Sequence, residues 1–539
     1  MRAIQATPKN IESIFNEMYV IPEFQRPYSW DNIPCSELFE DIKNFFEDHY
    51  DNEEQYYLGN IVLYRDGEKW VVIDGQQRLT TMMLLLSALY SQARTATALQ
   101  SCLKKKDSLT GELVDELKIE SNVIEDDRKE LDDVVLRNND TGDSQIKKNY
   151  RSLREMLKSY LSELSAEKVN NFILMILKRV VLLPIECDSV DDALIIFNTL
   201  NNRGMPLNDA DIFKALLFKN IKNNADKKRL IKRWNVLNTD TDGDIEGLFR
   251  QLMHIMRARN KVVSKEIGLR KYFMEQDIFN DWNTVLTSLE KINFLNYFEN
   301  FSGKAKNLWE ILHYLPNEFC LYPVIVFWDK YAEKSDDGWK IPEKNLDKFE
   351  DLITDTVKYY YASAVAYNSI NTIKTTTYKV CSAIANGESY KEYYFKDYNK
   401  IYEQFCIKLK NYEYGRCRWG LVALLAILNE KQDQDKLYEL PDWQLEHILP
   451  QKGGYNNYNG WTETQYEEKL NTIGNFVLLE KKLNIRASNE FFTKKKCEYK
   501  NSSINEAKDL TTLLDWTYEE WSTRNKAKEK ELESFFRIV

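Results

Sequence analysis

Short apolar runs rich in β-branched and aromatic residues predict two strands near the N-terminus. These are NIVLY (Asn60 to Tyr64) and KWVVIDG (Lys69 to Gly75), and the polar RDGE between them supplies a turn. We therefore expect a hairpin that ends at Gly75. A largely buried helix should follow, LTTMMLLLSALYSQA (Leu79 to Ala93), with Thr80 or Thr81 near its start.

Most of the remaining chain has the spacing of helices. Apolar residues recur three and four positions apart over about 146–435, except in RVVLLPIECD (179–188), which predicts a strand. The polar stretch 96–148 indicates a short insertion with a flexible loop. Near the C-terminus, TIGNFVLLEKKLN (472–484) predicts strand, turn and helix. The closing DWTYEEWSTRNKAKEKELESFF predicts a charged amphipathic helix.

Composition narrows the class of protein. A chain of 539 residues is too long to fold around a single hydrophobic core. Its content of 43% hydrophobic residues, with 13% aromatics, is enough to form several cores. The net charge of -10 gives no sign of a nucleic-acid binder, although a local basic surface can still hold phosphates. The eight cysteines lack the spacing of a zinc site, and no segment is long and apolar enough to span a membrane. We expect a soluble cytoplasmic protein.

The end of the predicted hairpin has the features of a phosphate-binding loop. In VIDGQQRLTT (72–81), Gly75 permits close approach, a helix N-terminus offers free N–H groups, and Arg78 adds a planar cation. Arg26, in the upstream stretch IPEFQRPYSWD (21–31), could close such a site. A tight turn with a surface arginine explains the same residues. The chain has no G-x-x-x-x-G-K-[ST], which excludes a P-loop.

The C-terminal part contains a candidate for phosphodiester chemistry. In QLEHILPQ (444–451), Glu446 directly precedes His447, one of only four histidines, so we do not expect a centre with several histidine ligands. Asn475 and Asn484 follow nine residues apart, and a carboxylate with an amide oxygen suits Mg²⁺ better than zinc. A lone Glu–His pair is more often structural.

A basic segment follows this candidate site. EKKLNIRASNEFFTKKKCEYK (480–500) carries seven Lys or Arg and three Glu in an acidic protein. Contact with DNA phosphates is one explanation, and a solvated helix face is the other. The best candidates for DNA contact are Lys494, Lys495 and Lys496.

Four blocks in order resemble the GmrS-type N-terminal domain of the ParB/sulfiredoxin-like group. They are IPEFQRPYSW, YYLGNIVLY, VIDGQQRLTT and IIFNTLNNRGMPLNDADIFKALL (195–217). The resemblance implies nucleotide binding and hydrolysis by Gln25, Arg26, Asp74, Gly75, Gln76, Gln77 and Arg78. In the fourth block, Asn208 or Asp209 is expected to cap a helix near Ala210. Asn201, Asn202 and Arg203 are further nucleotide candidates.

The order EHILPQ, NTIGNFVLL and LNIRASNEFFTKKK resembles the GmrD-type C-terminal domain, a branch of the HNH (ββα-metal) nucleases. The resemblance implies that His447 is the general base, that Glu446 and Asn484 bind the metal, and that Asn475 orients the histidine ring. Many HNH enzymes carry Asp where this chain has Glu446.

Together these resemblances imply a GmrSD-like type IV restriction endonuclease of α+β, predominantly helical fold. We expect a ParB/sulfiredoxin-like sensor domain (1–235), a helical middle (236–400) and an HNH nuclease (401–539). The substrate would be double-stranded phage DNA with modified bases such as glucosylated hydroxymethylcytosine. The cofactors would be Mg²⁺ or Mn²⁺ and an NTP (GTP, CTP, UTP or ATP), and a homodimer is left open. One alternative is a phosphorothioate-sensing nickase of the SspE kind. Another is a nucleotide-regulated DNA-binding module with an inactive nuclease site.

Overall fold

The computed structural model describes residues 5–538 apart from 51, 94–96, 108, 124, 191, 194, 195, 197–208, 264–266, 297–302, 368–370, 439–442 and 452–457. The chain is α+β and mostly helical, as the sequence predicts. It divides into two compact units, Met1–Arg233 and Trp234–Val539, with the division inside helix α10. The three-domain division at 1–235, 236–400 and 401–539 stays a prediction. No helix in the described ranges is long and apolar enough to cross a bilayer.

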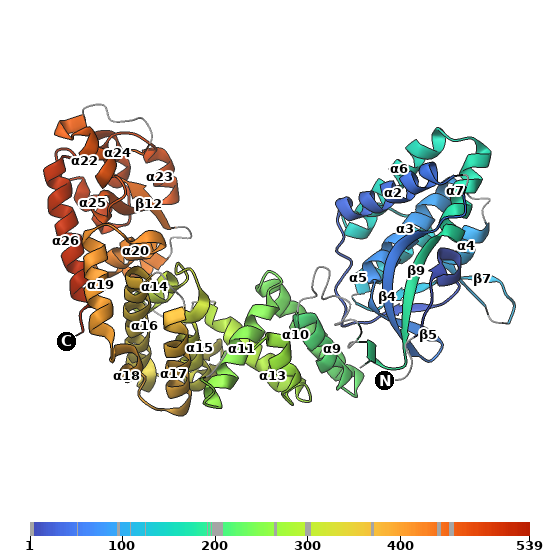
Figure 1. Cartoon of the computed structure of the whole chain (residues 1–539), viewed down its shortest axis with the longest axis horizontal. Coiled ribbons are helices and arrows are strands. Elements are labelled where there is room, and N and C mark those ends of the chain that lie inside the picture. The colour runs from blue at the N-terminus through green and yellow to red at the C-terminus, as the bar shows by residue number, and fades with distance from the viewer. Residues whose placement is uncertain are drawn as a thin grey trace. The chain divides into compact units, whose positions relative to one another are not determined.

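A mixed sheet forms the centre of the first unit (Figure 1). Its strand order is β1-β9-β4-β5-β3-β8, and β2 also pairs with β9. The described elements of this unit are β1 (Gln5–Ala6), β2 (Lys9–Asn10), α1 (Ile11–Ile14), β3 (Tyr19–Ile21), α2 (Asn32–Asp48), β4 (Tyr56–Asp66), β5 (Lys69–Asp74), α3 (Gln76–Gln92), α4 (Thr97–Leu103), β6 (Lys104–Lys106), β7 (Leu113–Leu117), β8 (Ile119–Ser121), α5 (Glu125–Arg137), α6 (Gln145–Ser162), α7 (Ala166–Arg179), β9 (Val180–Cys187), α9 (Asp209–Lys219) and α10 (Asn224–Asp240).

Alternation along the strands gives the sheet two apolar faces. Ile61, Leu63 and Val72 lie in the core that α2, α3, α6 and α7 cover. Val62 and Ile73 lie on the opposite face, in a smaller core that includes Ala215 of α9. The sheet is therefore buried between helices, and the turn after β5 lies where the sheet meets α3.

The predicted hairpin and the strand at 179–188 are confirmed as β4–β5 and β9. The helix after the hairpin begins at Gln76, so the apolar run from Leu79 continues this helix and does not start it. Thr80 and Thr81 are therefore buried within α3, and neither caps it. The stretch 96–148 is more than an insertion with a loop, because it supplies helix α5 and strand β8, which pairs with β3.

Helices dominate the second unit, and a two-stranded sheet, β12–β13, lies in its C-terminal part (Figure 1). The apolar helix α20 packs against α14, α26 and both strands of this sheet. The described elements are α11 (Ile245–Arg259), α12 (Leu269–Met274), α13 (Trp282–Asn296), α14 (Gly303–Leu312), α15 (Tyr322–Tyr331), β10 (Glu333–Ser335), β11 (Gly338–Lys340), α16 (Leu346–Tyr367), α17 (Asn371–Asn386), α18 (Lys391–Phe395), α19 (Tyr398–Lys410), α20 (Arg418–Leu428), α21 (Gln434–Tyr438), β12 (Trp443–His447), α22 (Glu463–Lys469), β13 (Phe476–Glu480), α23 (Lys481–Ala487), α24 (Phe492–Tyr499), α25 (Asn505–Leu510) and α26 (Tyr518–Phe536).

Candidate functional sites

Glutamine side chains hold the first and third N-terminal blocks together. Gln25 donates from Nε2 to the Ile73 carbonyl oxygen at 3.0 Å, at the end of β5. Gln76 donates to the Arg26 carbonyl oxygen at 3.0 Å, and Gln77 accepts from the Ser29 backbone N–H at 3.0 Å. The fold thus brings the two blocks into contact, and it uses these three side chains to do so.

The two arginines of this region also have partners. Arg26 pairs through Nε with Asp211 of α9 at 3.1 Å, so the fourth block contacts the first. Arg78 donates from Nη1 to the Asn60 carbonyl oxygen at 2.8 Å. Gly75 adopts a φ of 91° at the N-cap of α3, and a Cβ there would lie 2.4 Å from the Ile61 Cγ2 atom. Only glycine fits this turn.

The space beside these side chains is small. Burial raises the pKa of the Asp74 carboxyl, and the nearby Arg78 guanidinium opposes that rise. A recess lined by Arg26, Gln76 and Gln77 has a volume of about 10 Å³, which is room for about one water molecule. A nucleotide does not fit into this recess unless it widens. Asn201, Asn202 and Arg203 lie outside the described residues.

The second candidate site is built on β12, β13 and α23. The two strands are antiparallel, with His447 opposite Phe476, and α23 follows β13 directly without the predicted turn. His447 is the last residue of β12. Its ring lies edge-on to the Phe476 ring, with 4.5 Å between the ring centroids. Lys495 donates to the His447 carbonyl oxygen at 2.5 Å and fixes the backbone at this point.

The His447 imidazole is neutral near pH 7. Burial lowers its pKa to about 4, and a hydrogen bond to Asn471 opposes that shift. The positive charges of Arg418 and Lys495 lower the pKa further. A neutral ring has one nitrogen with a free lone pair, which is the form that can accept a proton from water.

Glu446 lies on the other side of β12 from His447, since neighbouring strand residues point to opposite faces. The residue is buried, and its carboxylate pairs with the Lys495 ammonium at 2.7 Å. Tyr499 also donates to it, at 2.9 Å. Burial raises the Glu446 pKa, and the Lys495 charge offsets part of that rise. An ammonium therefore neutralises the carboxylate that the family resemblance assigns to a metal.

Asn475 does not orient the His447 ring, which corrects that expectation. It is fully buried; its Oδ1 accepts from the Leu449 backbone N–H at 2.9 Å, and its Nδ2 donates to the Leu470 carbonyl oxygen at 2.8 Å. The Trp516 indole also donates to its Oδ1, at 3.2 Å. Asn475 thus fixes the segment that follows β12 to the turn that precedes β13.

Asn484 lies half-buried on α23, the helix that packs against both strands. Across the ranges that the structure describes, no group of three or more His, Cys, Asp or Glu side chains has the arrangement of a metal site. With Glu446 paired to Lys495, the predicted pair of Glu446 and Asn484 does not fit a bound divalent cation in this arrangement.

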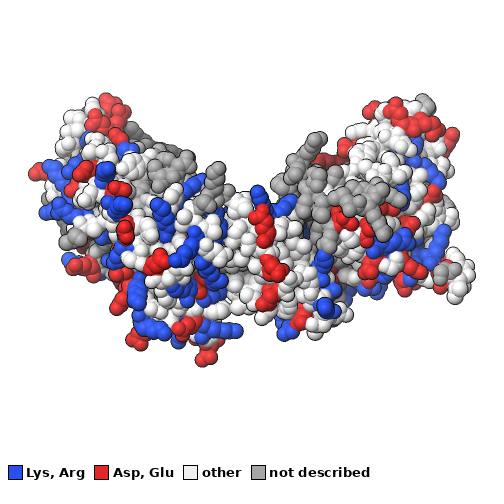
Figure 2. Space-filling view, turned by 60° about the horizontal axis from the view of Figure 1, so that its bottom comes forward, with Lys and Arg blue, Asp and Glu red and all other residues white. Residues whose placement is uncertain are grey.

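The three candidate lysines differ in accessibility. Lys494 is exposed on α24 and pairs with Glu490 at 2.9 Å. Lys496 is half-buried and donates to the Leu513 carbonyl oxygen at 2.5 Å. Lys495, with 1% of its side chain exposed, cannot reach a DNA phosphate, which corrects the expectation for this residue. On the face shown in Figure 2, described basic and acidic side chains are interspersed.

Three residues beside His447 were missed by sequence reasoning. Asn471 Oδ1 lies 3.2 Å and Gln451 Nε2 lies 2.8 Å from His447 Nε2. Arg418, the first residue of α20, donates from Nη1 to Asn471 Oδ1 at 2.9 Å. Asn471 is only four residues before Asn475, so the nine-residue spacing pointed to the segment that lies beside His447, but not to the asparagine that contacts its ring.

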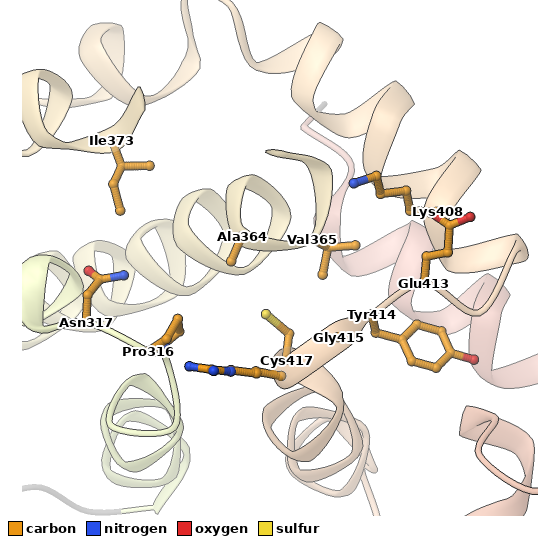
Figure 3. Close-up of a pocket in the computed structure, with 11 residues that line it drawn as sticks. Pro316, Asn317, Ala364, Val365, Ile373, Lys408, Glu413, Tyr414, Gly415 and Cys417 are labelled. Carbon is orange, nitrogen blue, oxygen red and sulfur yellow. The ribbon is translucent and has the colours of Figure 1, made fainter. Parts of the chain in front are cut away.

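A cavity of about 600 Å³ lies in the second unit, close in sequence to Arg418 (Figure 3). Lys408 and Glu413 stand at one end of it and Asn317 at the other. Tyr414 contributes to its wall, while the Tyr414 hydroxyl accepts from the Ile473 backbone N–H at 3.2 Å. The cavity wall is thereby tied to the turn that carries Asn471 and Asn475.

Comparison with known families gives two matches. Residues 10–218 match the N-terminal domain of the GmrSD restriction endonuclease, and residues 396–528 match the C-terminal domain of GmrSD restriction endonucleases. The two matched segments together cover well over half of the chain, in the same order as the sequence blocks. No curated protein matches it.

Proposed function

The chain belongs to the GmrSD-like type IV restriction endonucleases, and from this premise we propose that it cuts modified phage DNA with His447 as the general base. Membership of the family makes the protein a DNA endonuclease and DNA its partner. The type of nuclease site, its cofactors, the DNA modification and the regulation are the parts that we propose.

One observation carries the assignment of the nuclease site. Within the segment that matches the C-terminal domain, His447 ends a strand of a two-stranded sheet whose second strand leads directly into a helix. This order is the one expected of an HNH site. The neutral His447 ring can accept the proton of an attacking water, a role worth typically 10²- to 10⁴-fold in rate.

The proposed reaction is hydrolysis of a phosphodiester bond. The water oxygen bonds to phosphorus, the bond from phosphorus to the leaving oxygen breaks, and the water's proton moves to His447. The leaving oxygen takes a proton from solvent. Bound Mg²⁺ or Mn²⁺ would supply charge stabilisation, and we propose a requirement for one of them from the family resemblance. Glu446 is held by Lys495, so in this arrangement its carboxylate is not available to the metal.

We also propose that an NTP binds beside the Asp74–Arg78 turn and controls cleavage. Contact between the Gln25–Arg26 segment and this turn supports a shared site. The N-terminus of α3, where Gly75 provides no side-chain cap, and the Arg78 cation suit phosphate. Binding requires the recess beside Gln76 to widen, because its present volume holds about one water molecule.

The substrate is tested by digestion of three DNAs with and without each NTP in Mg²⁺ or Mn²⁺. The DNAs are unmodified plasmid, phosphorothioated plasmid and phage DNA with glucosylated hydroxymethylcytosine. We expect cleavage of the glucosylated DNA alone. Nicking confined to phosphorothioated DNA would replace this function with the phosphorothioate-sensing nickase. Binding without cleavage of any DNA would favour the inactive DNA-binding module.

A further inference from the structure

Three polar side chains lie around His447 Nε2, namely those of Arg418, Asn471 and Gln451. Arg418 Nη1 donates to Asn471 Oδ1 at 2.9 Å, and the same Oδ1 lies 3.2 Å from His447 Nε2. Gln451 Nε2 lies 2.8 Å from the same ring nitrogen. Among the described residues, no group hydrogen-bonds to His447 Nδ1.

The chemistry of Arg418 settles the orientation of Asn471. A guanidinium carries donors only, so the Asn471 atom that faces it must be the amide oxygen. That oxygen has two lone pairs and can accept a second hydrogen bond, from His447. If Nε2 carried a lone pair instead, two acceptors would face each other at 3.2 Å. The proton of the neutral ring therefore belongs on Nε2.

We propose that Asn471, held by Arg418, is the positioning residue for His447 and keeps its proton on Nε2, so that Nδ1 faces the water to be activated. This inference rests on the proposed role of His447 as general base. It assigns to Asn471 the task that the family resemblance gave to Asn475.

Contacts with neighbouring residues limit the positions of Arg418 and of the exposed Asn471. The Arg418 guanidinium lies over the Phe476 ring, 5.2 Å from its centroid, and Phe476 is the strand partner of His447. Asn471 directly precedes Thr472, whose hydroxyl accepts from the Trp521 indole of α26 at 2.8 Å. Fixed neighbours hold a histidine ring in one orientation, which lowers the entropy cost of reaching the reactive geometry.

Gln451 offers the competing arrangement. If its amide nitrogen donates to His447 Nε2, the ring proton lies on Nδ1 and Asn471 has no orienting role. The two ends of a glutamine amide occupy nearly the same positions, so Gln451 can equally present its oxygen to an Nε2–H group. With the proton on Nε2, the ring N–H is shared between the Asn471 and Gln451 oxygens. In the competing arrangement Asn471 Oδ1 still accepts from Arg418, but it lies 3.2 Å from a ring lone pair.

Nitrogen NMR of the full-length protein labelled with ¹⁵N-histidine tests the inference. With four histidines in the chain, the His447 signals are identified by their loss in His447→Gln. We expect the proton on Nε2, with an Nε2–H signal that is protected from exchange. Asn471→Ala should lose this protection, Asn471→Asp should keep it because it retains an acceptor oxygen, and Gln451→Ala should keep it too. A proton on Nδ1, or protection that is lost in Gln451→Ala and kept in Asn471→Ala, would overturn the inference.

Cleavage kinetics give the second measurement. Asn471→Ala should lower kcat about 10-fold or more with little change in KM for DNA, because a positioning residue acts after binding. Asn471→Asp should recover most of the rate. Unchanged kcat in Asn471→Ala would overturn the inference. The NMR result does not depend on cleavage, so failure of the nuclease assignment, seen as cleavage by His447→Gln, is distinguishable from failure of the positioning role.

Discussion

At the scale of single residues, the proposed nuclease site contains side chains that are buried in the fold as well as side chains that lie beside His447. Glu446 and Lys495 are both buried, and their pairing is part of the core between β12 and α24. Buried ion pairs add little net stability, but loss of one partner leaves an unpaired charge in the interior. The basic segment after the motif is therefore only partly available to DNA.

Because Glu446 and Lys495 form a buried ion pair, we expect removal of Lys495 to cause a large loss of stability that a second substitution at Glu446 recovers. Lys495→Met should lower the free energy of unfolding by about 3–5 kcal/mol, because Glu446 loses its cation. The double variant with Glu446→Gln should recover much of that loss. Urea unfolding of the two single variants and the double variant measures the coupling. Lys494→Met, at an exposed position, is the matched control. A Lys495→Met variant of normal stability and weakened DNA binding would show that Lys495 contacts DNA.

His254 predicts a pH dependence of stability in the second unit. The ring stacks on Tyr322 at 3.9 Å, and burial lowers its pKa to about 3. The folded state binds fewer protons than the unfolded state between about pH 6.5 and 3, so stability should fall as the pH falls through this range. The loss is at most about 1.4 kcal/mol per pH unit for one group.

His254→Phe should reduce that slope, since the unfolded state no longer gains a proton at this position. Urea unfolding at pH 7.0, 6.0 and 5.0 provides the comparison, with His49→Gln, at a half-buried position of the first unit, as control. Parallel curves for wild type and His254→Phe would contradict this explanation.

At the scale of elements, the closing helix α26 holds the turn that precedes β13. Asn525 accepts from the Gly474 backbone N–H at 2.8 Å, and Arg524 donates to the Gly474 carbonyl oxygen. Trp521 binds Thr472 at 2.8 Å. The charged helix that the sequence predicts thus has a specific task, because it fixes the turn that places Asn471 beside His447.

Close contact between α26 and the turn makes Gly474 irreplaceable. A Cβ at Gly474 would lie 2.5 Å from the Asn525 Cβ, so Gly474→Ala should push the helix from the turn and cost about 1–3 kcal/mol of stability. We expect cleavage to fall as well. Thermal unfolding and a cleavage assay measure both effects. Gly268→Ala, where a Cβ meets open space, is the control. Normal stability and cleavage in Gly474→Ala would refute this account of the turn.

Helices and strands with a strong pattern of apolar residues could be predicted from the sequence. The contacts that individual side chains make with one another could not. The β4–β5 hairpin and β9 follow from β-branched runs, and the α26 helix follows from its periodicity. The strand β8 has three residues and no pattern of its own, since its neighbour β3 creates it. In the same way, spacing located the 471–475 turn but could not show that Asn475 faces the interior and Asn471 faces His447.

At the scale of the whole molecule, the two candidate sites belong to different compact units. The Asp74–Arg78 turn lies in Met1–Arg233, and His447 lies in Trp234–Val539. Regulation of cleavage by nucleotide therefore requires that one unit communicate with the other. We propose that the nucleotide state of the first unit controls the nuclease of the second.

The variant Arg78→Ala tests whether nucleotide binding in the first unit controls cleavage in the second. It should impair NTP hydrolysis strongly, because Arg78 is the cation at the start of α3, and the change in cleavage on NTP addition should disappear. Cleavage without NTP should match that of the wild type. Arg65→Ala, on the outer end of the same hairpin, is the control. Normal hydrolysis by Arg78→Ala would place the phosphate site elsewhere in the chain.

The central claim is that DNA is cut at His447. Its most direct test compares cleavage of the preferred modified DNA by wild type, His447→Ala and the control variant His49→Ala from the first unit, each in Mg²⁺ or Mn²⁺. We predict that His447→Ala loses at least about 10²- to 10⁴-fold in rate while its NTP hydrolysis and stability match those of His49→Ala. Cleavage by His447→Ala at the wild-type rate would contradict the account.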